Sequence, residues 1–155
     1  MSDNSQIQPE PISKIRPEPI SQIQSELVEE FAMFEDWMSR YEHVIDLGRQ
    51  LPEFAEEWKT DRNKIQGCQS QVWLNMEMRD GKMHIDGTSD ASIVAGLVAI
   101  ALRVYSDQAP QDILDTKPDF INDIGFNDHL SPTRSNGLHS MLRSIYQKAG
   151  QNLVS

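Results

Sequence analysis

The residue with the clearest chemical potential is the single cysteine, Cys68. The stretch around it reads Ile65-Gln66-Gly67-Cys68-Gln69-Ser70-Gln71-Val72-Trp73. Gly67 gives the backbone before the sulfur conformations that other residues rarely adopt, and it lets another molecule approach closely. Polar residues follow the sulfur, and an apolar run typical of a strand begins at Val72. Cys68 is therefore predicted to lie on a loop at the start of a strand, where a partner can reach its thiol.

A lone cysteine is most often a small buried apolar residue. The polar neighbours of Cys68 argue against burial in a core and favour a functional thiol. Because the thiolate is the nucleophile, a positive group nearby would have to lower the pKa of the thiol. The candidates are Lys64, Arg134 and a helix N-terminus. Apolar neighbours such as Val72 or Trp73 are expected to shield the side chain in part.

Three further residues could assist the thiol. Arg134 is predicted in the first turn of the last helix, where the helix dipole disfavours a cation, so an anion there would offset that cost. A salt bridge to one of the many carboxylates explains Arg134 equally well. Asp90 is best explained as a helix N-cap, and a catalytic role is the less favoured interpretation. His129 could act as a base for the thiol, although a lone loop histidine more often makes surface hydrogen bonds.

Several classes of function are disfavoured by what the sequence lacks. One cysteine and four histidines without paired spacing do not form a zinc motif. No phosphate-binding glycine loop and no Gly-x-Ser-x-Gly motif occurs. The net charge of −10 disfavours binding to nucleic acid and to anionic lipid. The longest apolar run, residues 93–102, is too short to span a bilayer. A single cysteine and an N-terminus without signal-peptide features lead us to expect a cytoplasmic protein.

Periodicity predicts an α+β fold with helices packed on a small antiparallel sheet. Apolar residues at helical spacing begin near Ser25, and Asp36 could cap a second helix. Residues 72–79 and 82–86 alternate with period two around the turn signal Asp80-Gly81, which predicts a hairpin. Residues 91–105 are apolar on most sides and rich in small residues, which predicts a central helix with close backbone packing. Ser131-Pro132 predicts the start of the last helix.

The N-terminal residues contain an internal repeat. Residues 9–16 (PEPISKIR) are followed by residues 17–24 (PEPISQIQ). Proline at alternate positions blocks helix and sheet formation, so residues 1–24 are predicted to be a disordered tail, with a docking motif as the less favoured alternative. A single domain is expected over residues 25–150.

Four blocks of sequence carry a resemblance to a known family. The blocks are Tyr41…Leu47-Gly48…Leu51-Pro52, residues 65–73, Gly87-Thr88-Ser89-Asp90-Ala91-Ser92-Ile93-Val94-Ala95-Gly96-Leu97, and residues 129–138, which read HLSPTRSNGL. With these blocks in family order, residues 40–149 resemble the SufE family of cysteine desulfuration proteins, the sulfur acceptors of iron–sulfur cluster assembly. The Gly-Cys-x-Ser-x-Val-Trp motif is the most specific part of the resemblance.

The resemblance implies a fold similar to that of the IscU scaffold and a role in sulfur transfer. Cys68 would take the terminal sulfur of a persulfide on a SufS-like cysteine desulfurase and pass it to a SufBCD-like cluster scaffold. Gln69, Asp90, His129 and Arg134 would assist or contact the partner. The pyridoxal phosphate would reside on the desulfurase, and this chain would need no cofactor or metal and have no independent turnover.

Several alternatives stay open at this point. A CsdE-like branch of the family would serve a different downstream acceptor, and a non-catalytic activator of the desulfurase would not carry sulfur at all. A stand-alone hydrolase or peroxidase would pair Cys68 with a fixed base, and a structural adaptor would tolerate its loss. A homodimer is compatible with the sequence.

Overall fold

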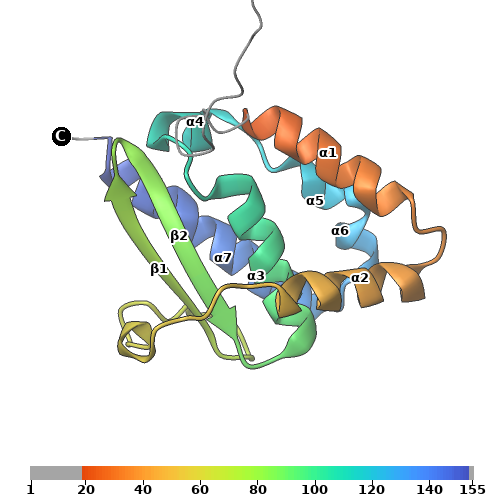
Figure 1. Cartoon of the computed structure of the whole chain (residues 1–155). Helices are drawn as coiled ribbons and strands as arrows, with labels where there is room; N and C mark the ends of the chain where they lie inside the picture. Colours follow the sequence, from red (N-terminus) through yellow and green to blue (C-terminus); the bar gives the residue numbers. More distant parts are fainter. Residues whose placement is uncertain (1–18, 154–155) are drawn as a thin grey trace, which may run out of the picture.

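A two-stranded hairpin packs against helices arranged around the central helix α3 (Figure 1). The computed structural model describes residues 19–153. The hairpin consists of β1 (Val72–Arg79) and β2 (Lys82–Ser89). In chain order the helices are α1 (Ile20–Ala32), α2 (Trp37–Arg49), the short 3₁₀ helix η2 (Glu56–Trp58), α3 (Ser92–Tyr105), α4 (Pro110–Asp115), α5 (Asp119–Ile124), α6 (Phe126–His129) and α7 (Pro132–Gln151). This arrangement confirms the predicted α+β class.

The hairpin has the predicted turn and first strand, and its second strand runs on to Ser89, three residues beyond the predicted end at Asp86. The strands pair antiparallel from Val72 opposite Ser89 to Arg79 opposite Lys82. Asp80 and Gly81 both have positive φ, 53° and 81°, as a two-residue type I′ turn requires. The inward side chains are fully buried near the start of β1 and become exposed toward the turn. On β2, Met83 beside the turn is also fully buried and forms a bridge with Gln108, so both ends of the hairpin are anchored.

Residues 63–65 run back along the outer edge of β1. The amide of Ile65 donates to the carbonyl of Val72 at 2.9 Å, and the amide of Leu74 donates to the carbonyl of Asn63 at 2.9 Å. Lys64 and Trp73 form an isolated antiparallel bridge between these two bonds. The loop of residues 66–71, which carries Cys68, is thus closed at its base by backbone pairing.

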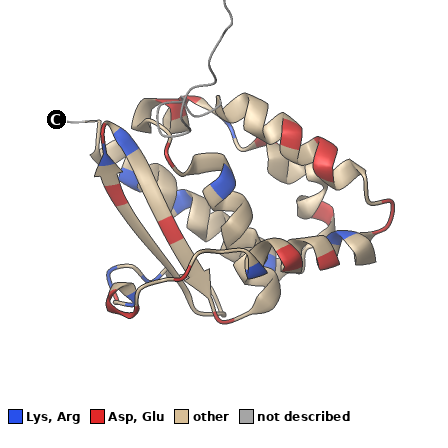
Figure 2. Cartoon of the chain, viewed as in Figure 1, with Lys and Arg blue, Asp and Glu red and all other residues tan. Residues whose placement is uncertain are grey.

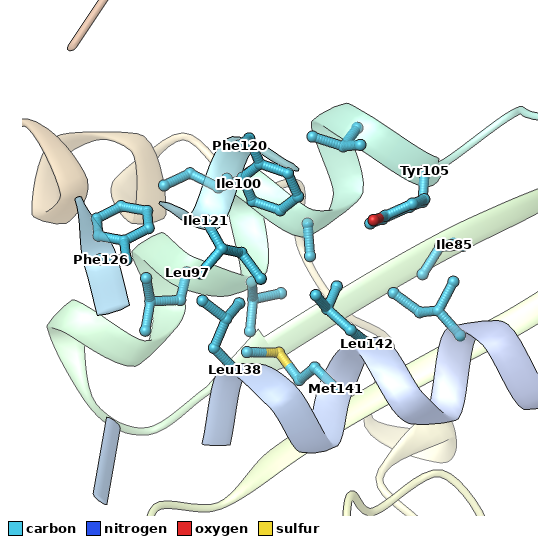
Figure 3. Close-up of a cluster of buried hydrophobic side chains, with 14 of the residues drawn as sticks. Ile85, Leu97, Ile100, Tyr105, Phe120, Ile121, Phe126, Leu138, Met141 and Leu142 are labelled. Atoms are coloured by element: carbon cyan, nitrogen blue, oxygen red, sulfur yellow. The ribbon is translucent and has the colours of Figure 1, made fainter. Parts of the chain in front are cut away.

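Helix α3 is buried along most of its length and contacts α1, α2, α7 and β2. It approaches α2 at two glycines, as its small residues predicted. A Cβ atom on Gly48 would lie 2.6 Å from the amide nitrogen of Gly96, and one on Gly96 would overlap the carbonyl of Val44. Figure 3 shows the core that surrounds this helix, drawn from β2, α3, α5, α6 and α7. The labelled side chains are Ile85, Leu97, Ile100, Tyr105, Phe120, Ile121, Phe126, Leu138, Met141 and Leu142.

Helix α1 begins at Ile20, five residues before the start expected near Ser25. Ile20 and Ile23 are buried in the core, and the buried Gln24 bonds to the segment before α5. The last residues of the second repeat are therefore helical, and the prediction of a tail up to residue 24 is wrong for them. Their apolar side chains are covered by helices after residue 110, which the local sequence pattern does not show. The remainder of the predicted tail, residues 1–18, lies outside the described residues.

Two predicted helix starts are confirmed. The side chain of Asp36 accepts a hydrogen bond from the amide of Ser39 at 2.8 Å and caps α2. Ser131 caps α7 by accepting a hydrogen bond from the amide of Arg134 at 3.3 Å, and Pro132 occupies the first helical position. The cap of α7 matters for the site, because its first turn lies beside Cys68.

The hydrogen bonds of the Gln24 side chain provide a test of how α1 is held against the start of α5. Its side-chain oxygen accepts from the amide of Phe120 at 2.8 Å, and its side-chain nitrogen donates to the carbonyl of Lys117 at 3.1 Å. We predict that Gln24→Ala lowers the free energy of unfolding by about 1–3 kcal/mol, because two backbone groups lose their partners. Glu29→Ala, at an exposed position of the same helix, is the control and should change it by less than about 0.5 kcal/mol. Equal effects in denaturant titrations would show that Gln24 contributes nothing beyond helix propensity.

Candidate functional site

Cys68 lies on the loop between residues 65 and 72, as predicted, and its side chain is half-buried against α7. Gly67 has a φ of 89°, and a Cβ atom there would lie 2.9 Å from Oγ of Ser140. The Cys68 thiol donates a weak hydrogen bond to the carbonyl of Gly137, with Sγ 3.8 Å from the oxygen. A Cβ atom on Gly137 would lie 3.6 Å from Sγ. The thiol therefore rests on α7 where a glycine leaves room for it.

The thiol opens into a groove of about 790 Å³. Four segments form its walls: the Cys68 loop, the first turns of α3 and α7, and one side chain of α2. The lining residues are Ile45, Cys68, Gln69, Ser70, Ala91, Ser92, Ile93, Val94, Ser131, Thr133, Arg134 and Gly137. A groove of this size accommodates a short peptide segment and not only a single atom.

Burial raises the pKa of the Cys68 thiol above its usual range. Burial is the sole cause of this shift, so no described cation lowers the pKa of the thiol in the free protein. The two cations that could lower the pKa of the thiol, according to the sequence analysis, lie in different places. Arg134 lines the groove, whereas Lys64 lines a different hollow. The thiol is therefore protonated and unactivated when the protein is alone.

Arg134 makes no ion pair with any carboxylate in residues 19–153, where the described salt bridges involve other cations. The salt-bridge explanation of Arg134 thus has no support in this part of the chain. Its guanidinium lies at the start of α7, where the helix dipole is also positive. The groove therefore contains a positive charge that no described anion neutralises.

Helix α3 adds a second helix N-terminus to the groove. Ser92, Ile93 and Val94, its first residues, line the groove, and α3 has no side-chain N-cap. The amides of a first helical turn have no acceptor within the helix, and they favour anions. Two helix N-termini and one arginine thus make this groove electropositive within a chain of net charge −10.

Asp90 is not the N-cap that we predicted. The N-cap of α3 is Ala91, and Asp90 instead accepts a hydrogen bond from the amide of Gln71 at 3.0 Å. The amide of Asp90 in turn donates to the carbonyl of Gln71 at 3.2 Å. The prediction missed this role because Gln71 is distant in sequence. Asp90 ties the end of the Cys68 loop to the turn between β2 and α3, and it lines a smaller adjoining hollow of about 180 Å³.

His129 is not among the residues that line the groove. Its ring stacks on Trp37 with a centroid distance of 4.1 Å, and Nδ1 lies 3.0 Å from the carbonyl oxygen of Gly125. The backbone carbonyl of His129 accepts from the hydroxyl of Tyr41. The structure therefore gives His129, the last residue of α6, a packing role against α2 and does not place it as a base for Cys68.

Gln69 lines the groove with an exposed side chain, so it stays a candidate for partner contact. Neither of the expected shields of the thiol, Val72 and Trp73, lines the groove: Val72 is fully buried in the core against which Cys68 packs, and Lys59 lies over the ring of Trp73. The apolar groove residues are Ile45, Ile93 and Val94, which the sequence analysis assigned only to helices. Gly137, a glycine inside the predicted last helix, was a signal of close approach that the sequence analysis did not use.

Similarity to known proteins decides the family. The SufE family, described as an Fe-S metabolism associated domain, matches residues 25–149. The chain belongs to the SufE family. An uncharacterized SufE-like protein of Rhizobium meliloti (strain 1021) is 42% identical over 128 residues, which cover 79% of this chain and 91% of that protein. The solution structure of a hypothetical protein from Thermus thermophilus has a TM-score of 0.72 at 16% identity, covering 91% of this chain and 100% of that one, and so shows the same fold.

Membership of the SufE family confirms the resemblance found in the sequence and supports a role in sulfur transfer with a cysteine desulfurase. The described part of the SufE chain holds no group of three or more His, Cys, Asp or Glu side chains placed to share a metal ion. Within residues 19–153, no helix combines the length and the hydropathy that a bilayer crossing requires.

Gly67 offers a test of how the loop is seated. We predict that Gly67→Ala lowers the free energy of unfolding by about 1–2 kcal/mol through its positive φ, and severalfold accelerates alkylation of Cys68 because the new Cβ lifts the loop from Ser140. Gly81→Ala is the control, since it has similar strain and no neighbour within 4 Å. It should cost similar stability and leave alkylation unchanged. Adding Ser140→Ala to Gly67→Ala should restore slow alkylation; if it does not, Ser140 does not seat the loop.

Proposed function

We propose that this SufE-family protein accepts sulfur on Cys68 from a SufS-like cysteine desulfurase and delivers it to an iron–sulfur cluster scaffold. The observation that carries the proposal is the placement of the single thiol in an open, electropositive groove. A buried structural cysteine would need neither the opening nor an arginine that pairs with no carboxylate of residues 19–153. A cytoplasmic location and the absence of a cofactor on this chain are part of the proposal.

The proposed step is an exchange between sulfur atoms. The Cys68 thiol gives its proton to the anionic outer sulfur of the desulfurase persulfide, and the thiolate so formed attacks that neutralised outer sulfur. A bond forms between Sγ of Cys68 and that outer sulfur. The bond between the two sulfurs of the desulfurase breaks, and the desulfurase cysteine leaves as a thiolate. No external oxidant or reductant is required, because one disulfide-type bond replaces another.

The electropositive groove suits both anions of this exchange. A persulfide is more acidic than a thiol and carries negative charge near neutral pH, so the first turns of α3 and α7 and Arg134 favour it. In the free protein, burial disfavours the thiolate of Cys68, because the raised pKa keeps the thiol neutral until a partner arrives. Partial burial also protects a bound persulfide from small thiols.

Two alternatives share this site and differ in outcome. A CsdE-like protein would accept the same sulfur and deliver it elsewhere. A non-catalytic activator would bind the desulfurase and stimulate it without Cys68. The structure of the groove favours acceptance over activation alone, because the thiol lies within the groove and not beside it.

We predict that incubation with a SufS-like desulfurase and cysteine adds one or more sulfur atoms, about 32 Da each, to Cys68. Intact mass and peptide mapping measure the addition. Cys68 should alkylate slowly in the free protein, since it is half-buried and its pKa is raised, and faster when the desulfurase is present.

Cys68→Ser is the control for this experiment. It should fold and bind the desulfurase but accept no sulfur. Stimulation of the desulfurase by Cys68→Ser equal to that by the unchanged protein would support the activator instead. If sulfur flow to a scaffold is also normal, Cys68 is not the acceptor.

Arg134 is predicted to act on the transferring sulfur and not on the resting thiol. Arg134→Ala should slow sulfur acceptance about tenfold or more, because a charge-assisted contact contributes roughly 1.5–3 kcal/mol. It should leave the pH midpoint of Cys68 alkylation unchanged in the free protein, because burial alone raises the pKa. Arg143→Ala, an exposed position of the same helix outside the groove lining, is the control. A fall in the thermal midpoint with normal acceptance would make Arg134 structural.

A further inference from the structure

A second hollow of about 650 Å³ lies beside β1 and α7, next to the Cys68 loop. Three cations line it: Arg62, Lys64 and Lys148. Most of the other lining groups are uncharged amides and hydroxyls, and the one carboxylate, Glu77, pairs with Arg79 outside the lining. The hollow is therefore polar and positively charged.

These three cations differ from the cations of residues 19–153 that form ion pairs. Arg49, Lys59, Arg79 and Arg103 each contact a carboxylate at 2.5 to 3.1 Å. Arg62, Lys64 and Lys148 contact no carboxylate in the described part of the chain, although the sequence has 24 acidic and only 14 basic residues. Figure 2 shows cations both on the segment that precedes β1 and on α7. Unpaired cations gathered in one hollow of an acidic protein call for an anionic partner.

The hollow adjoins the Cys68 groove along two segments. In the segment before β1, Ile65 at the base of the Cys68 loop lines the hollow, and Cys68 lines the groove. On α7, Gly137 lines the groove and Ser144 lines the hollow, so seven residues separate them, or about 10 Å along the helix. The two sites therefore lie side by side on one surface, with Gly67 and Ser140 between them.

One partner protein would cover both sites. A specific interface buries roughly 800 Å² on each protein, which extends well beyond 10 Å in every direction. A partner that brings a persulfide to Cys68 would therefore also cover Arg62, Lys64 and Lys148. Covering cations without pairing them is unfavourable, so the facing surface must supply carboxylates.

We propose that the hollow lined by Arg62, Lys64 and Lys148 binds a carboxylate-rich segment of the desulfurase that loads Cys68. This inference rests on the proposed function, since it assigns a second contact to the same partner. The hollow contributes affinity and fixes orientation, and it takes no part in the exchange between sulfur atoms.

The test compares two double variants with equal loss of charge. Lys64→Gln with Lys148→Gln removes two cations of the hollow. Lys82→Gln with Lys117→Gln removes two lysines that lie outside both sites and contact no carboxylate among residues 19–153. Each full-length variant is titrated against a SufS-like desulfurase with cysteine at low and high salt. The readouts are the concentration giving half-maximal sulfur loading of Cys68, the rate at saturation, and the thermal midpoint.

We expect the hollow variant to need about tenfold more protein for half-maximal loading at low salt, because two interface ion pairs of modest strength add to about that factor. The rate of sulfur loading at saturation should be unchanged in the hollow variant, and its half-maximal concentration should depend less on salt. The control variant should match the unchanged protein in both readouts. If the titration of the hollow variant is unchanged, or if both variants are weakened equally, the hollow does not bind the desulfurase. The proposal that Cys68 accepts sulfur is not affected by that result. If the unchanged protein takes no sulfur on Cys68, the proposed function fails and this inference fails with it.

Discussion

The close contact between α2 and α3 at Gly48 and Gly96 is the constraint on which the site depends. A side chain at Gly96 would overlap the carbonyl of Val44, so the two helices could not approach as they do. Because α3 is apolar on most sides, it is stable only where other elements cover it. Its first turn then lies beside Ile45 of α2 and the start of α7. The walls of the Cys68 groove therefore depend on the close packing of α2 and α3, which the glycines at positions 48 and 96 allow.

The site combines two opposing electrostatic effects. Burial disfavours the thiolate of Cys68, while two helix N-termini and Arg134 favour an anion in the groove. In the free protein, burial determines the pKa of the thiol, and the positive groups have no described anion to bind. The two effects are compatible if the anion enters with a partner. Such a site is unreactive alone and becomes complete only in a complex.

The sequence was informative wherever neighbours along the chain determine the structure. Period-two alternation with Asp80-Gly81 predicted the hairpin, and small residues in 91–105 predicted the close packing of α3. The Cys68 loop and the N-caps Asp36 and Ser131 follow from local preferences as well. The errors concern contacts between distant segments. Asp90 binds Gln71 across the hairpin, and Ile20 and Ile23 are buried by helices that lie about a hundred residues later, which no local pattern reveals.

The attachment of the Cys68 loop explains how a half-buried thiol can still meet a partner. Strong bonds hold the ends of the loop: residues 63–65 pair with β1, and Asp90 holds Gln71. The centre is held weakly, because Sγ of Cys68 is 3.8 Å from the carbonyl oxygen of Gly137 and Gly67 has no side chain to pack. Turning the thiol outward would break that weak hydrogen bond and the packing of the Cys68 side chain on the core, and it would leave the bonds at both ends intact. The low cost of this local movement, compared with unfolding of the loop, lets partner binding determine which way the sulfur faces.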